Sequence, residues 1–97
     1  MFNELDPLLH SQLRLAVMSL LINLEEAEFV YIKKQTNVSA GHLSLQLDKL
    51  KQAEYIQIIK GIKNNYPVTV CKITPKGIKA FEQYVADIKE YLQVGKK

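Results

Sequence analysis

Residues 39–52 combine regularly spaced leucines with polar side chains that can form hydrogen bonds. Ser39 is a good helix N-cap, because its hydroxyl can accept a hydrogen bond from a free amide of the first turn. After it, Leu43, Leu47 and Leu50 recur at spacings of four and three, which predicts one buried face of a helix. The opposite face and its flanks carry Gly41, His42, Ser44, Leu45, Asp48 and Lys49. A helix with such a face fits the major groove of DNA, where every base pair shows a distinct donor and acceptor pattern.

Each contact residue of this predicted helix suits one kind of interaction with DNA. Gly41 permits close approach, and Leu45 can pack on a thymine methyl group. His42 and Ser44 can hydrogen-bond to base edges or phosphate, while Ser39 and the free amides of the helix start can hold a phosphate. The predicted contact residues of this helix are Ser39, Ala40, Gly41, His42, Ser44, Leu45 and Lys49.

Charge along the sequence is uneven, although the net charge is only +3. Residues 1–28 hold five acids against one arginine, a local charge of −4, whereas residues 55–81 hold five lysines and no acid, a local charge of +5. A cationic segment of this kind suits a polyanion such as nucleic acid. Lysine runs are also common as plain solvated surface, so this pattern alone does not decide the function.

The cationic segment also has the pattern of a β-hairpin. Residues 55–60 and 68–74 are rich in β-branched and aromatic residues and predict two strands, and residues 61–67 predict the loop between them. We expect Lys60 and Lys63, with Asn64 and Asn65 at the loop tip, to lie on DNA phosphates or in the adjacent minor groove. Alternatively, the two lysines are ordinary edge-strand charges that prevent sheet aggregation.

Two helices are predicted before residue 39. Residues 8–24 follow an Asp6-Pro7 start signal and place Leu9, Leu13, Val17, Leu20 and Leu24 at helical spacing. Residues 25–28 predict a short acidic connection. The helical rhythm of residues 29–36 then ends at Asn37, which suits a left-handed turn. Only Val38 separates this end from Ser39, so the second and third helices predict a helix-turn-helix.

The final predicted helix starts at Thr74-Pro75, an N-cap followed by proline. It carries an apolar stripe that one small domain cannot wholly cover. We therefore expect a homodimer in which residues 78–94 form the dimerisation helix and the N-terminal segment around residues 5–9 packs beside it. The predicted interface is Leu5, Leu8, Leu9, Ile78, Phe81, Tyr84, Val85, Ile88, Tyr91 and Leu92. The alternative is that this helix folds back on the first helix of its own chain.

Other kinds of site find little support in the sequence. His10 and His42 are too few for a metal site, and no cofactor is expected. Cys71 is the only cysteine and most simply packs as a small buried hydrophobe on a strand. No nucleophile motif, phosphate loop or paired carboxylates occur, so we do not expect an enzyme. No apolar run approaches the roughly 20 residues of a membrane span, so we expect a cytoplasmic protein without a membrane partner.

These residues resemble the winged-helix domains of the MarR-like and ArsR-like bacterial transcriptional regulators, in particular the small subgroup with a C-terminal dimerisation helix. The resemblance covers nearly the whole chain and is carried by residues 5–10, Arg14-Leu15, residues 39–44, residues 53–56 and residues 73–77. It implies a mainly α fold with a small β-hairpin, arranged as a winged helix-turn-helix in one domain of residues 1–97.

The chain departs from the family pattern in four ways. Family members usually have glycine at the position of Glu54, so the expected left-handed turn must tolerate a side chain here. They usually have a basic residue where Leu45 and Asp48 stand, and histidine where Gln46 stands. They also usually carry arginine near the segment that here reads Pro67-Val68-Thr69. Each of the four departures bears on DNA binding or local geometry rather than on the core.

We therefore expect a homodimeric transcriptional regulator that binds specific double-stranded DNA. The helix at residues 39–52 would enter the major groove, and the basic wing would lie on the backbone or in the minor groove. The alternative is a winged-helix protein–protein interaction module that has lost DNA binding, because a fold alone does not determine function. The exposed face with Leu45 and Asp48 favours the alternative, whereas the serine-capped helix and the lysine-rich segment favour DNA.

Overall fold

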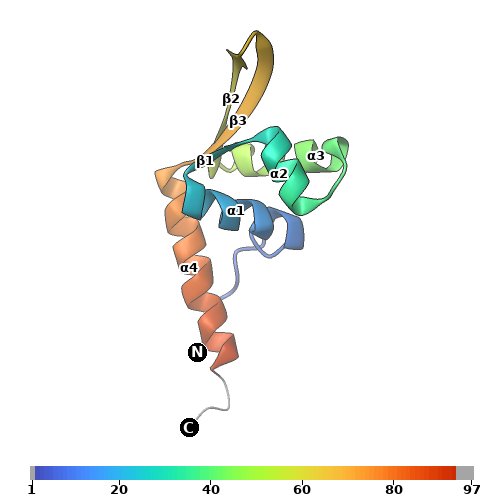
Figure 1. Ribbon diagram of the computed structural model, residues 1–97. Helices are drawn as coiled ribbons and strands as arrows, with labels where there is room; N and C mark the ends of the chain where they lie inside the picture. Colours follow the sequence, from blue (N-terminus) through green and yellow to red (C-terminus); the bar gives the residue numbers. More distant parts are fainter. Residues whose placement is uncertain (1, 94–97) are drawn as a thin grey trace.

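The computed structural model describes residues 2–93. Its elements, in chain order, are helix α1 (Gln12–Leu24), strand β1 (Glu26–Glu28), helices α2 (Phe29–Thr36) and α3 (Ala40–Gln52), strands β2 (Ile56–Lys63) and β3 (Tyr66–Ile73), and helix α4 (Pro75–Leu92). In Figure 1 the β2–β3 hairpin projects at one end and α4 extends at the other, with the remaining helices between them. The predicted winged helix-turn-helix with an added C-terminal helix is confirmed.

The first helix starts later than the sequence pattern predicts. Residues 6–10 form a separate turn. The Leu8 amide donates to the carboxylate of Asp6 at 2.9 Å, and the His10 amide donates to the backbone carbonyl of Asp6 at 2.9 Å. Ser11 is extended, with φ −149°, so α1 begins only at Gln12. The predicted start at residue 8 is wrong because Asp6 closes this turn with its own side chain and carbonyl.

The buried face of α1 is broader than the predicted stripe. Val17 is buried as expected, but Met18 and Leu21 are buried with it. Leu24, which the stripe places in the core, is 47% exposed. The difference arises because α1 packs against helices α2, α3 and α4 as well as strands β1 and β3, so neighbours cover it on several sides.

The helix-turn-helix forms as predicted. Helix α2 ends at Asn37, whose backbone is left-handed with φ 55°. Helix α3 begins after Ser39, whose hydroxyl accepts a hydrogen bond from the His42 amide at 3.1 Å. These two local signals place α3 against the core, where Leu43, Leu47 and Leu50 are at most 2% exposed.

The sheet has three strands, not the two of a simple hairpin. Residues 26–28, predicted as a connection, form β1, which pairs antiparallel with β3 so that Glu26 lies opposite Lys72. The strand order is β1-β3-β2. The prediction of a connection is wrong because β1 is a short acidic strand stabilised by a partner more than forty residues along the chain.

The hairpin, which we call the wing (residues 56–73), has a much shorter loop than predicted. Strands β2 and β3 pair continuously from Ile56 opposite Ile73 to Lys63 opposite Tyr66. Only Asn64 and Asn65 connect them, with φ 51° and 66°. Two left-handed residues make the tight turn that matches the twist of paired strands. Pro67 is tolerated within β3 because it lies beyond the end of the pairing with β1.

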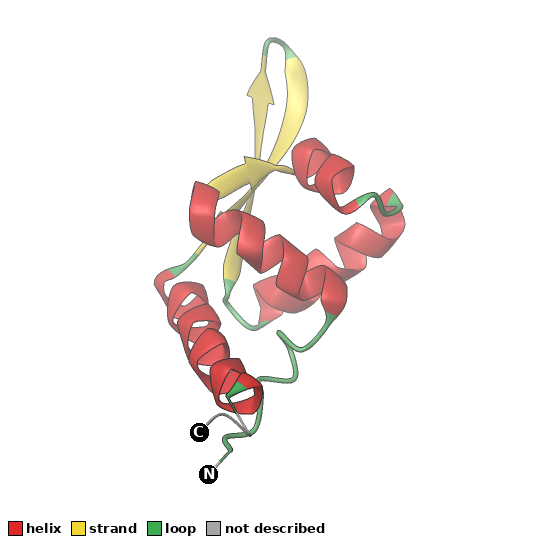
Figure 2. Cartoon of the chain, turned by 60° about the horizontal axis from the view of Figure 1, so that its bottom comes forward, coloured by secondary structure: helices red, strands yellow, loops and turns green. Residues whose placement is uncertain are grey.

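Helix α4 begins where the Thr74-Pro75 signal predicts. The Thr74 hydroxyl accepts from the Gly77 amide at 3.0 Å and donates to the backbone carbonyl of Glu54 at 2.6 Å. The start of α4 is thereby tied to the turn between α3 and β2. Figure 2 shows the N-terminal segment beside α4, and α4 also contacts α1. No helix within residues 2–93 is long and apolar enough to cross a membrane.

Candidate nucleic-acid interface

The outer face of α3 is exposed as the helical wheel predicts. All seven predicted contact residues are exposed, together with Asp48: Ser39, Ala40, Gly41, His42, Ser44, Leu45 and Lys49. Leu45 is the large apolar member, with 56% of its surface exposed. Nothing lies within 4 Å of the position where Gly41 would carry a Cβ atom, so the helix can approach another surface closely there. Contact with DNA stays a prediction for each of these residues.

Gln46 belongs to the inner face of α3. The sequence did not predict that this polar residue is buried with a structural role. It is only 8% exposed, and its side-chain carbonyl accepts a hydrogen bond from Arg14 Nη1. Arg14 Nε also donates to the backbone carbonyl of Leu8 at 2.6 Å. The spacing of Leu43, Gln46, Leu47 and Leu50 fits a helical face at i, i+3, i+4 and i+7, which could have revealed it. Arg14 therefore ties α3 to the turn that precedes α1.

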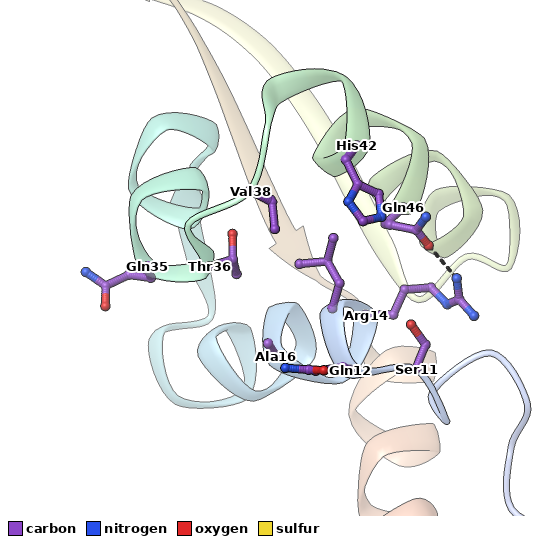
Figure 3. Close-up of a pocket in the computed structure, with 10 residues that line it drawn as sticks. Ser11, Gln12, Arg14, Ala16, Gln35, Thr36, Val38, His42 and Gln46 are labelled. Carbon is purple, nitrogen blue, oxygen red and sulfur yellow. Dashed lines mark hydrogen bonds between the residues drawn. The ribbon is translucent and has the colours of Figure 1, made fainter.

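A cavity of about 600 Å³ adjoins the start of α3. It lies where the beginnings of α1 and α3 meet the end of α2, and Figure 3 shows His42, Gln46 and Arg14 together along one side of it. Its lining is polar and apolar in about equal parts, and its residues are Ser11, Gln12, Leu13, Arg14, Ala16, Gln35, Thr36, Val38, His42 and Gln46. His42 therefore borders both the exposed face of α3 and this cavity.

The pairing of β2 and β3 assigns the two wing lysines to opposite faces. Lys60 alternates with Ile56 and Ile58, so it continues the face that packs on the core. With Ser44 and Asp48 it lines a hollow of about 340 Å³ between α3 and the wing. Lys60 has no ion-pair partner among the described acids. Lys60 and the exposed face of α3 thus border the same hollow.

Lys63 lies on the other face of the wing and has an acidic partner. Its Nζ is 3.0 Å from Oε2 of Glu28, the last residue of β1. Strand β1 places Glu28 opposite Val70, on the same sheet face as Lys63. The side chains of Lys63 and Glu28 are 63% and 36% exposed, so water and salt screen this pair. The sequence did not reveal the pair, since the residues are far apart in the chain.

The turn between α3 and β2 takes the left-handed form expected where the family has glycine. Glu54 has φ 66°, so this non-glycine residue bears the backbone strain. Its carboxylate lies 3.6 Å from Lys76 Nζ. Next to it, the Tyr55 hydroxyl donates to Asp6 Oδ2 at 2.6 Å. Burial, with this hydrogen bond and the Asp6 charge, raises the pKa of Tyr55 to about 12.

The residues of the predicted dimer surface differ in how far they are already buried within this chain. Leu9 and Tyr84 are buried, at 0% and 5% exposure, so they lie beneath the predicted dimer surface and pack in the core of this chain. Tyr91 and Leu92 are exposed, at 41% and 69%. The partly buried members are Leu5, Leu8, Ile78, Phe81, Val85 and Ile88. Val94, the last residue of the predicted dimerisation helix, lies outside the described residues.

Residues 2 and 3 pack along α4 of their own chain. Asn3 Nδ2 donates to Asp87 Oδ1 at 2.9 Å, and the Tyr91 hydroxyl donates to the Asn3 carbonyl at 3.1 Å. The rings of Phe2 and Tyr91 stack with centroids 4.7 Å apart. Helix α4 also contacts α1, so part of it packs on the body of its own chain.

Metal chemistry has no visible basis in the described part of the chain. Within residues 2–93, no three His, Cys, Asp or Glu side chains gather as metal ligands would. Cys71 is buried in β3 as predicted, and burial raises the pKa of its thiol to about 11. His10 instead pairs with a tyrosine, since its Nδ1 lies 2.9 Å from the hydroxyl of Tyr84.

Comparisons with known proteins agree with this arrangement. Residues 13–92 match a family model described as a winged helix DNA-binding domain. An uncharacterized protein of Methanocaldococcus jannaschii is 34% identical over 79 residues, which cover 81% of this chain and 86% of that protein.

Solved structures of transcriptional regulators share the fold. A transcriptional regulator homologue from Pyrococcus horikoshii OT3 superposes with a TM-score of 0.84 at 24% identity, covering 89% of this chain and 85% of that one. The regulator BldR from Sulfolobus solfataricus has a TM-score of 0.72 at 19% identity, covering 86% of this chain and 58% of that one. At such identities the likeness to these regulators is one of fold.

Proposed function

This chain belongs to the winged helix DNA-binding domain family, and from that premise we propose that it is a homodimeric regulator of transcription that binds specific duplex DNA. The family is one of DNA-binding regulators and not of enzymes. In the proposed complex, the exposed face of α3 enters the major groove and the wing lies on the backbone or minor groove. Residues 1–97 act as one domain, and residues 78–94 supply the dimerisation helix.

The observation that carries the proposal is the hollow between α3 and the wing. It brings Ser44 and Lys51 of α3 together with Lys60 of β2. The exposed groups around this hollow can contact the edge of the major groove, which admits a helix, and the phosphates along that edge. Residues 55–81 hold five lysines and no acid, so this segment suits a polyanion.

The dimer is supported by the incomplete cover of α4. Val85 and Ile88 are only partly buried, and Leu92 is 69% exposed. The chain is also elongated, with extents of 58 × 26 × 21 Å, because α4 and the wing extend from opposite ends of the core. A second copy that packs on this face would bury the stripe and bring two α3 helices into one assembly.

A protein–protein interaction module remains the second candidate, and two observations favour it. Leu45, at the centre of the exposed face of α3, is 56% exposed and apolar, and Asp48 beside it is acidic. In addition, Glu28 already pairs with one of the two wing lysines. Both features weaken the attraction of this surface for phosphate and suit a partly apolar protein partner.

Selection of bound duplexes from a random pool distinguishes the two functions. A DNA-binding homodimer should enrich a two-fold-related site whose half-sites lie about 10 base pairs apart, centre to centre. Its affinity for that site should fall steeply with salt, by about 0.9 in log affinity per log salt for each phosphate neutralised. If no site is enriched, the DNA proposal fails and the interaction module takes its place.

A further inference from the structure

The end of α1, strand β1 and the start of α2 expose apolar side chains close together. Leu24 is 47% exposed, Val30 is 67% exposed and Tyr31 is 42% exposed. They line an open groove of about 610 Å³, whose other lining residues are Glu26, Ala27, Glu28 and Lys34. Large apolar side chains that gather around one groove, rather than lying singly on the surface, indicate a surface that binds a partner.

This groove is separate from the hollow that the proposed function assigns to DNA. The strand order β1-β3-β2 puts β1 at one edge of the sheet and β2 at the other. Helix α3 packs against β2, and the hollow between α3 and the wing shares no lining residue with the groove. In Figure 1, β1 runs from the end of α1 to the start of α2. The groove therefore belongs to the β1 edge of the molecule.

The outer edge of β1 is open to main-chain pairing. Within residues 2–93, no strand pairs with β1 on the side away from β3. The Ile73 amide donates to the Glu25 carbonyl at 3.0 Å, and the direction of the backbone groups alternates from one residue to the next along a paired strand. The amide and carbonyl of Glu26 therefore point outward, where an extended peptide can pair with them.

The charge at the β1 end of the groove favours a basic partner residue. Glu26 is exposed and lies opposite Lys72, but neither residue belongs to an ion pair within the described part of the chain. Lys34 supplies a positive charge only at the α2 end of the lining. A protein segment complements this arrangement if it places apolar side chains on Leu24 and Val30 and a lysine or arginine beside Glu26.

We propose that this groove binds an extended segment of a second protein, in which apolar residues lie beside a lysine or arginine. The segment pairs with the outer edge of β1, its apolar side chains contact Leu24 and Val30, and its cation binds the Glu26 carboxylate. The surface differs from the one around Leu45, and its use does not require that the chain binds DNA. In a DNA-bound regulator it gives a second protein a place at the same site.

Selection from a displayed library of random short peptides tests the proposal, with the intact wild-type protein as the target. We expect the enriched peptides to combine apolar residues with a lysine or arginine. In fluorescence titrations, Leu24→Ser with Val30→Ser should bind synthetic copies of these peptides about tenfold more weakly than the wild type does. N-methylation of one peptide amide at a time should weaken binding most at the residue that pairs with Glu26.

Matched controls separate the groove from other exposed surface. Ile59→Ser removes an apolar side chain that is 48% exposed on β2, at the opposite edge of the sheet, and should leave peptide affinity unchanged. Glu26→Gln should weaken peptide binding and reduce its salt dependence, whereas Glu82→Gln, at an exposed position of α4, should do neither. Glu28 stays unchanged, because its ion pair with Lys63 reaches the wing.

Thermal melting shows whether each variant is folded. Leu24→Ser with Val30→Ser shortens two exposed side chains and should melt close to the wild type. Glu26→Gln changes no apolar side chain, so it tests the proposal even if the serine variant unfolds.

The outcomes separate this inference from the proposed function. The proposal is overturned if no peptide is enriched, or if the enriched peptides bind the folded variants as they bind the wild type. Loss of DNA affinity in the serine variant would assign the groove to DNA instead, and a smaller oligomer of this variant in sedimentation would assign it to a second copy of the chain. If the wild type binds no duplex but its peptides depend on Leu24, Val30 and Glu26, the proposed function fails and this inference stands.

Discussion

Gly77, in the first turn of α4, packs directly on the backbone carbonyl of Tyr55. A Cβ atom added to Gly77 would overlap the Tyr55 carbonyl oxygen and press on the Ile73 side chain. The same carbonyl accepts a hydrogen bond from the Thr74 amide at 3.1 Å. The glycine therefore allows α4 to begin in contact with the turn that leads from α3 to the wing, and it connects the proposed dimerisation helix with the proposed DNA-binding elements.

Gly77→Ala should destabilise the fold by about 3 kcal/mol, because the added methyl group meets backbone that cannot move aside easily. Urea unfolding measures the change in the free energy of unfolding. Gly41→Ala is the matched control, since Gly41 also lies in a helix but has open space around it. That control should be neutral or stabilise by up to about 1 kcal/mol. Equal effects at the two glycines would contradict the close contact.

Val85→Glu with Ile88→Glu should convert a dimer into monomers. Both side chains are partly buried on the apolar side of α4, and two added carboxylates would repel the facing copy. Sedimentation at micromolar concentration measures the state. The control, Ala86→Glu with Lys89→Glu, places the same acids on the exposed side of the helix and should leave the dimer intact. A wild-type monomer, or a dimer that survives the first pair of changes, would exclude this interface.

The two wing lysines should differ in their contribution to DNA affinity. Lys60→Ala should reduce the salt slope by about 0.9, the value for one phosphate, because no described acid competes for this lysine. Glu28→Gln should instead raise affinity, because it frees Lys63 from its 3.0 Å ion pair. Fluorescence titrations across salt concentrations measure both effects.

Glu82→Gln is the control for the Glu28 change, since it removes the same charge from an exposed position on α4. It should leave affinity nearly unaltered, because charges separated by more than a Debye length are screened. If Glu28→Gln behaves like this control, the ion pair does not compete with DNA. If Lys60→Ala with Lys63→Ala binds as the wild type does at all salt concentrations, the wing plays no part.

Residues on the two faces of α3 should respond differently to alanine. Leu47→Ala should cost roughly 2 to 5 kcal/mol of stability, as a truncation of a buried leucine. His42→Ala and Leu45→Ala should hardly change the melting temperature, because both positions are exposed. Each should reduce preference for the selected site by about 1 to 3 kcal/mol. Unaltered site preference in both exposed variants would remove α3 from the DNA-reading role.

The hydroxyl of Tyr55 should lose its proton at a higher pH than that of an ordinary tyrosine. Burial, with the hydrogen bond and charge of Asp6, raises its pKa from 10.0 to about 12. The folded state then holds a proton that the unfolded state releases, so this group's contribution to stability is complete below pH 10 and declines as the pH rises from 10 to 12. Phenolate absorbance should therefore show one late-ionising tyrosine.

Tyr55→Phe should abolish that late phase and the matching decline in the free energy of unfolding. Tyr31→Phe, at a residue that is 42% exposed, should leave the late phase in place. A late phase that persists in Tyr55→Phe would place the shifted tyrosine elsewhere. Asp6→Asn should lower the pKa of Tyr55 in part, because burial remains when the charge is gone.

Local signals in the sequence were sufficient for most of the helical framework. Ser39 and Thr74 cap helices where predicted, and Asn37 ends α2 in the left-handed conformation that its side chain tolerates. The spacing of Leu43, Leu47 and Leu50 correctly separated the inner and outer faces of α3. These features depend on hydrogen bonds and side-chain periodicity within a few residues, so they can be read before the chain is folded.

Contacts between distant segments were decided only by the tertiary structure. Strand β1 exists because β3 pairs with it, and Gln46 is satisfied because Arg14 reaches it from the start of α1. Lys63 meets Glu28 only after the sheet has formed. The energy of each contact comes from a partner 32 to 46 positions away in the sequence, and no local pattern encodes that distance. The extent to which α4 is left uncovered likewise depends on the packing of the whole chain.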